Sequence, residues 1–179
     1  MAKYRITIDG FIRRSREIPE DLRRASVRGF QAAGLVLAAE VPVQISRTSP
    51  HPAVDTGALR NSVQFTPLPD GCVVSVTAPH AAPIENGTRP FSPPLRPLIE
   101  WALRKGLADT EEEAKQVAFR VRAAIRRRGI APRYYFRTAW QKSRPAMRRA
   151  IKAELDKLPY GTVRVRISKG GDGPSGKMG

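Results

Sequence analysis

The segment "LRNSVQFTPLPDGCVVSVTAP", residues 59–79, decides the fold. Val63 and Phe65 alternate with polar residues in its first half, and Val74 and Val76 alternate in the same way in its second half. A period of two is typical of strands that bury one face. The tripeptide Pro-Asp-Gly between the two halves favours a tight turn. The segment therefore predicts an antiparallel β-hairpin.

Helical periodicity surrounds this hairpin on both sides. Small and apolar residues recur every three or four positions from Pro19 onward, and Pro42 is expected to end or kink that helix. Farther along the chain, Thr110 and Glu113 predict a capping box at the start of a helix that Gly129 ends. Other expected elements are strands at 3–9 and 162–168 and helices at 94–106 and 130–158, the last with a kink or a restart at Pro145.

These elements predict an α+β fold. We expect a small antiparallel β-sheet packed by a long N-terminal helix, an additional helical insertion at about 95–128 and a long C-terminal helix. Residues 1–168 are expected to form a single domain, because the chain is long enough for one core. Residues 169–179 have the glycine-rich composition of a flexible tail.

The charge balance is unusual. The chain holds 32 Lys and Arg against 16 Asp and Glu, a net charge of +16, which favours polyanionic partners. Residues 114–153 include thirteen basic residues and no acid. Solvated helix faces would account for some of them, but the absence of any acid favours an electrostatic role. The candidates for contact with DNA or with an acidic partner are Arg120, Arg122, Arg126, Arg127, Arg128 and Arg133.

Sequence-specific nucleic-acid binding is not expected. The chain has no helix-turn-helix, zinc-finger or RNA-binding signature. The aromatic run Tyr134, Tyr135 and Phe136 would either stack on bases or belong to the core, and its place beside a helix start favours the core. Binding to DNA without regard to sequence stays open as an alternative function.

Catalysis is not expected either, and neither a metal nor a cofactor is predicted. The two histidines, His51 and His80, lie in proline-rich segments without a second metal ligand at a suitable spacing. A pair of His80 and Glu85 is the one catalytic arrangement to consider, but no nucleophile or phosphate-binding motif accompanies it. The single cysteine, Cys72, excludes an intrachain disulfide. With no signal-peptide pattern and no apolar run long enough for a bilayer, we expect no membrane contact.

Three segments, in this order, resemble one family. They are "VDTGALRNSVQF" at 54–65, "HAAPIENGTRPFSPP" at 80–94 and "GIAPRYYFRTAW" at 129–140. Together with the helix before them, they resemble the neck, or head–tail joining, proteins of long-tailed bacteriophages, which are also called tail-completion or minor tail proteins. The resemblance covers roughly residues 19–158. His80 departs from the tyrosine that is usual there, and 95–128 is longer than in the shortest members.

The resemblance implies a structural role in the virion. It implies a homo-oligomeric ring around the DNA channel at the head–tail junction, assembled in the host cytoplasm. The implied neighbours are head-closure, tail-terminator or tail-tube proteins and the packaged DNA. Residues 85–88 would form a tight turn after a strand edge, with Glu85 accepting hydrogen bonds from loop amides or pairing with an arginine such as Arg60. The implied subunit or partner contacts are Glu85, Asn86, Gly87, Thr88, Arg89, Pro90 and Phe91.

Two functions of other classes remain as alternatives. The first is a sequence-nonspecific DNA-binding protein without a virion role, which would bind short duplexes tightly and with strong salt dependence. The second is a metal-dependent nuclease or hydrolase, which would lose its activity when His80 or Glu85 is replaced.

Overall fold

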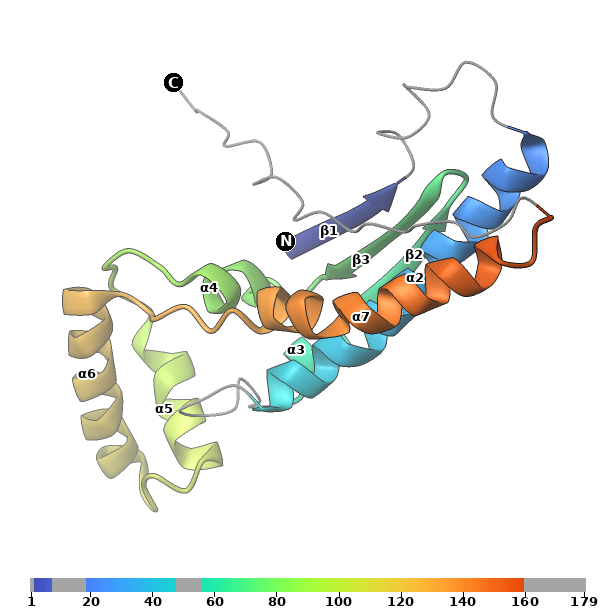
Figure 1. Ribbon diagram of the computed structural model, residues 1–179. Coiled ribbons are helices and arrows are strands. Elements are labelled where there is room, and N and C mark those ends of the chain that lie inside the picture. Colours follow the sequence, from blue (N-terminus) through green and yellow to red (C-terminus); the bar gives the residue numbers. More distant parts are fainter. Residues whose placement is uncertain (1, 8–18, 48–55, 160–179) are drawn as a thin grey trace, which may run out of the picture.

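The computed structural model describes residues 2–7, 19–47 and 56–159, and it has the α+β architecture that the sequence predicts (Figure 1). A three-stranded antiparallel sheet lies beside two long helices that pack against each other. The described elements are β1 (Ala2–Thr7), α2 (Glu20–Arg47), α3 (Ala58–Asn61), β2 (Val63–Leu68), β3 (Gly71–Val76), α4 (Ala81–Asn86), α5 (Leu95–Arg104), α6 (Glu111–Arg128) and α7 (Tyr135–Leu155). The predicted strand at 162–168 and the tail at 169–179 lie outside the described residues.

The predicted hairpin is confirmed and forms two thirds of the sheet. Strands β2 and β3 pair in register from Val63 opposite Val76 to Leu68 opposite Gly71. Strand β1 pairs antiparallel with the other edge of β3, so the strand order is β1-β3-β2. The hairpin thus places its second strand, the most apolar one, at the centre of the sheet, where Cys72, Val74 and Val76 are fully buried.

Helix α2 packs against both the sheet and α7, and small residues make this close packing possible. A side chain at Gly29 would meet the backbone of Ile151 in α7 at 3.1 Å. A side chain at Gly34 would overlap the Cys72 sulfur of β3 and approach Phe65 of β2. Because Gly29 and Gly34 contact different neighbours, α2 presents one small residue to each of two packing partners.

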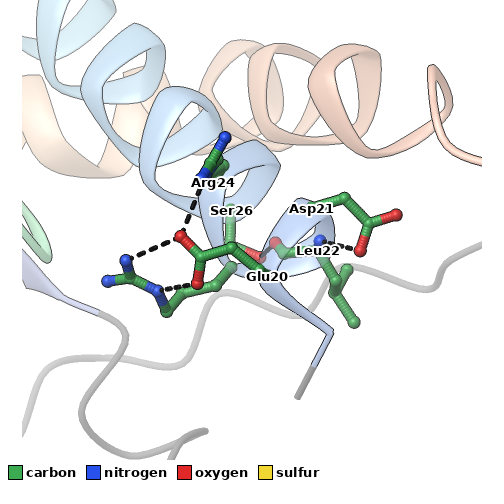
Figure 2. A network of polar contacts seen from close by, with 6 residues as sticks. Glu20, Asp21, Leu22, Arg24 and Ser26 are labelled. Atoms are coloured by element: carbon green, nitrogen blue, oxygen red, sulfur yellow. Dashed lines mark hydrogen bonds and ion pairs between the residues drawn. The ribbon is translucent and has the colours of Figure 1, made fainter.

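The start of α2 is held by its own charged residues. Figure 2 shows the Glu20 carboxylate bound to Arg24 and the Leu22 amide N–H donating to Asp21, at 3.0 and 2.8 Å. Arg23 donates to Glu20 as well, and the guanidinium groups of Arg23 and Arg24 lower the pKa of Glu20 to about 2. These contacts are exposed, so we expect them to orient the first turn of α2 more than to stabilise the fold.

Neither internal proline ends a helix. Pro42 does not end α2, which continues to Arg47, and α7 runs through Pro145 as one helix without a restart, so only the kink remains of the two alternatives expected at each proline. A proline removes one backbone hydrogen bond from a helix interior, and this loss is tolerated where tertiary packing supports both sides of it. Val41 and Ile45 flank Pro42 in the core, and Met147 follows Pro145 there.

The structure gives the buried faces of α2 and α5 and the start of α7. The buried stripe of α2 continues from Gly29 through Ala33 and Leu37. On α5, Ile99 is buried and Leu98 is half-buried. Helix α7 begins at Tyr135, five residues after the predicted start at 130.

Helices α5 and α6 form a hairpin with a small core of its own. Its buried residues are Ile99, Ala102, Ala114 and Ala118, separate from the main core. In Figure 1 this hairpin extends away from the sheet, with α6 at the periphery and α5 on its inner side. The predicted capping box begins α6, since the Glu113 amide donates to the Thr110 hydroxyl at 3.2 Å, while the Glu113 carboxylate accepts from the Asp109 amide.

Candidate assembly site

Glu85 caps a helix that lies far from it in the sequence. Its side chain is buried, with 3% of the residue exposed, at the end of α4. One carboxylate oxygen accepts from the Phe136 amide at 2.8 Å and the other from the Arg137 amide at 3.0 Å. These amides belong to the first turn of α7, where unpaired N–H groups and the helix dipole favour a negative charge. Glu85 therefore supplies the cap that the residue before the helix, Tyr134, does not.

Backbone hydrogen bonds continue this contact on both sides of Glu85. The amide of Tyr134 donates to the Glu85 carbonyl at 3.1 Å, and the amide of Arg133 donates to Ile84 at 2.9 Å. Beyond them, the Thr88 amide donates to the Ile130 carbonyl at 2.9 Å, and the Ile130 amide donates to the Thr88 hydroxyl at 3.0 Å. We call residues 84–88 and 130–137, which these bonds join, the α4–α7 clamp.

Two glycines allow the segments of the clamp to approach so closely. Gly87 has φ +75°, and a side chain there would meet the Ile130 carbonyl oxygen at 2.6 Å. Gly129 has φ +71°, and a side chain there would overlap the Thr88 carbonyl oxygen. Both the left-handed backbone and the lack of space require glycine.

The clamp corrects part of the local prediction around Glu85. Glu85 and Asn86 end helix α4 and do not form a tight turn after a strand. The carboxylate of Glu85 accepts from backbone amides, as expected, but these amides belong to the first turn of helix α7 and not to a loop. The other expected partner, Arg60, is exposed on α3.

The aromatic run beside the clamp has two buried members. Tyr135 and Phe136 are fully buried in the main core, so neither can stack on nucleic-acid bases. The Tyr135 hydroxyl donates to the Ala81 carbonyl at 3.1 Å, and burial, followed by the nearby Glu85 charge, raises the pKa of Tyr135. Tyr134 stays exposed, at φ +50°, and the Arg137 guanidinium lies 4.5 Å above its ring. The position of Tyr134 could not be inferred from the sequence, because the hydrogen bond of its backbone amide is made to a residue of α4.

The residues expected to form a subunit contact differ in accessibility. Asn86, Arg89, Pro90 and Phe91 are exposed, and Gly87 and Thr88 are half-buried. Glu85 is buried, and both of its carboxylate oxygens already accept hydrogen bonds within the chain. The accessible part of this candidate contact is therefore the segment 86–91, whose first residues, 86–88, belong to the clamp.

The basic candidates lie mainly on α6 and not on the clamp. Arg120, Arg126, Arg127 and Arg128 are exposed on α6. Arg122 is half-buried, with its guanidinium 5.1 Å from the centroid of the Phe119 ring. Arg133 is half-buried within the clamp. The arginines at the end of α6 also complement the helix dipole there, so part of their charge has a local structural explanation.

The structure separates the two residues of the one catalytic pair considered. His80 is exposed, whereas Glu85 is buried with both carboxylate oxygens directed at amides of α7. His51 lies outside the described residues. Among residues 2–7, 19–47 and 56–159, no group of three or more His, Cys, Asp and Glu side chains is placed to hold a metal ion. Cys72 is buried and donates to the Phe30 carbonyl at 3.3 Å.

Within the described part of the chain, none of the helices combines the length and the apolar character that crossing a membrane requires. Comparisons with family models, with curated proteins and with solved structures give no match to this chain.

Proposed function

We propose that this chain is a structural virion protein of a tailed bacteriophage, acting as a ring around the DNA channel in the head–tail connector. The observation that carries the proposal is the α4–α7 clamp. Two of the three segments that resemble the neck proteins, 80–94 and 129–140, meet in it. Their distinctive residues, Glu85, Gly87 and Gly129, each have a role in that contact.

The contact between these two segments supports the resemblance independently of the sequence match. Segments that matched a family by chance would have no reason to lie together, and their glycines would have no reason to need left-handed backbone. Here Glu85 accepts hydrogen bonds from the amides of Phe136 and Arg137, which lie 51 and 52 residues later in the chain. The proposed role is therefore a rigid, non-catalytic one.

A ring needs two different faces on each subunit, because each copy contacts the next through unlike surfaces. The exposed segment 86–91 is one candidate face. Its proline, Pro90, lowers the entropy that is lost when it docks, and the clamp holds its first residues, 86–88. The exposed arginines of α6 suit either the DNA channel or an acidic neighbouring protein.

The test uses the phage that encodes this chain. Deleting the gene should leave DNA-filled heads and separate tails in lysates, and supplying the protein from a plasmid should restore joined particles. Electron microscopy of the lysates measures both. Joined, infectious particles assembled without the protein would overturn the proposal.

The second candidate function is nonspecific DNA binding without a virion role. It is favoured by the exposed arginines of α6, which have no acidic residue between 114 and 153 to compensate them. It predicts that the isolated chain binds a duplex of about 20 base pairs tightly, with an affinity that falls steeply as salt rises. Fluorescence anisotropy at several salt concentrations distinguishes this behaviour from weak binding by a chain that needs its ring.

A further inference from the structure

Helix α6 has an outer face that no described element covers. The helix packs against α5 through Ala114 and Ala118, which are buried. The opposite face carries Glu112, Gln116, Phe119, Ala123 and Arg126, all of them exposed. Their spacing of four, three, four and three residues places them along one side of the helix. Figure 1 shows that this helix lies at the periphery of the molecule, so a partner can reach its outer side.

An aromatic ring lies at the centre of this outer face. Phe119 is 45% exposed, and the Arg122 guanidinium packs over its ring at 5.1 Å. Exposed aromatic residues beside arginine are typical of the centres of protein interfaces, where they bury a large apolar area at a small cost in entropy. Covering the Phe119 ring would stabilise a complex, because each Å² of apolar surface removed from water contributes about 25 cal/mol of favourable free energy.

The charges on this face are arranged symmetrically about Phe119. Glu112 lies seven residues before Phe119, and Arg126 lies seven residues after it. When two copies of a helix pack antiparallel about a shared central residue, positions at equal distances before and after that residue face each other. Glu112 near the start of α6 would then face Arg126 near the end of its partner.

We propose that the free chain forms a weak two-fold dimer in which α6 packs antiparallel against α6 of a second copy. Phe119 meets its own symmetry mate on the two-fold axis, and Glu112 pairs with Arg126 of the second copy on both sides of that axis. Glu112 and Arg126 have no ion pair with any residue that the structure describes, so they are available for this contact, whereas Glu111 is already paired with Arg96. Antiparallel packing also aligns the two helix dipoles favourably.

The expected affinity is low. One face of an 18-residue helix is smaller than a standard interface of roughly 1,600 Å². Two chains of net charge +16 also repel each other beyond the contact. We therefore expect a dissociation constant on the order of micromolar or weaker near 150 mM salt, where the Debye length of about 8 Å screens distant charges more than touching ones.

A charge-swap experiment on the purified full chain tests the dimer. Sedimentation velocity over a concentration series gives the dissociation constant. Glu112→Arg and Arg126→Glu should each weaken the dimer about ten-fold or more, since each places like charges at two symmetric contacts. The double variant should restore it, because the two exchanged side chains would again carry opposite charges where they face each other across the axis. The matched control is Arg148→Glu, an exposed arginine on α7 that has the same charge change and should leave the constant unaltered.

Crosslinking gives a second measurement that does not depend on charge. Lys115 lies four residues before Phe119 and Ala123 four residues after it, and both are exposed. A mixture of Lys115→Cys and Ala123→Cys chains should form a disulfide between copies faster than either variant alone. Cys72 should not interfere, because it is buried. A chain that stays monomeric at several hundred micromolar overturns the proposal. So does a folded double variant that fails to dimerise, or crosslinking that is equal in all three samples.

Discussion

Glu85 and Glu112 show two different uses of a carboxylate in one chain. Glu85 is buried, and both of its oxygens accept hydrogen bonds from the first turn of α7. Glu112 is exposed on the outer face of α6 and bonds to no described residue. A buried charge is tolerated only when its hydrogen bonds are satisfied, so the carboxylate of Glu85 serves the stability of the fold. An exposed charge has little effect on folding and stays available to a partner.

The same difference separates the two regions around these residues. The clamp joins α4 to α7 through glycines that leave no space for a side chain, and it adjoins the fully buried Tyr135 and Phe136. The α5–α6 hairpin has a small core in which three of the four buried residues are alanines, and it carries exposed arginines. Substitutions should therefore change stability in the clamp and association on α6.

The largest effect should come from breaking the clamp at Gly129. Gly129→Ala places a methyl group against the Thr88 carbonyl at a positive φ, and it should lower the free energy of unfolding by about 4 kcal/mol. Gly106→Ala is the matched control, because Gly106 has φ +62° but open space around it. It should lose only about 1–2 kcal/mol. Urea denaturation measures both, and equal losses would show that Gly129 contributes only its backbone conformation.

Removing the charge of Glu85 should have the next largest effect. Glu85→Gln keeps the shape but replaces one acceptor with an amide group, which faces a backbone N–H. We expect a loss of about 2–3 kcal/mol, because hydrogen bonds to charged groups are strong and the site is buried. Glu112→Gln makes the same chemical change on α6 and should alter stability by less than about 0.5 kcal/mol. A comparable loss in both variants would contradict the contrast between the two carboxylates.

Local patterns were sufficient to predict much of this fold. The hairpin at 63–76, the capping box of Thr110 and Glu113 and the glycine that ends α6 depend on residues within a few positions of each other. Local patterns could not decide whether the helices would continue through Pro42 and Pro145, because the packing that supports these prolines comes from other elements.

The role of Glu85 could not be read from the sequence for a similar reason. Its partners are amides 51 and 52 residues away, and a backbone amide leaves no mark on the residue type that carries it. The nearest signal was the pair of glycines at 87 and 129, each of which suggested left-handed backbone without indicating its neighbour. On α6, by contrast, the sequence alone contained the charge symmetry about Phe119, but only the structure showed that this face is exposed.

A smaller effect is expected from pH. Burial raises the pKa of the Cys72 thiol from 9.0 to about 11, and it raises the pKa of Tyr135 as well. At pH 8 and below, both groups are largely protonated in the folded and unfolded chain. Above pH 9 the unfolded chain loses these protons first, so stability should fall as the pH rises toward 11. Urea midpoints between pH 8 and pH 11 measure the fall, and Cys72→Ala should make it shallower.

The smallest change in stability should follow from reversing arginines on α6. Arg120→Glu combined with Arg127→Glu leaves Ala114 and Ala118 untouched, and each change should alter the free energy of unfolding by no more than about 0.5 kcal/mol. The same variant should bind duplex DNA more weakly and with a shallower salt dependence. A large loss of stability with unchanged DNA binding would reverse the assignment of the two regions.

The clamp has a further consequence for how this chain can vary in length. Thr88 and Ile130 bond to each other, so the chain leaves for the α5–α6 hairpin and returns from it at a single point. Everything between them is a loop whose ends are already joined, and the entropy of closing such a loop depends only weakly on its length. The hairpin can therefore be replaced as a unit. A short turn, or a different helical module, can be grafted at this point while the sheet, α2 and α7 keep their packing.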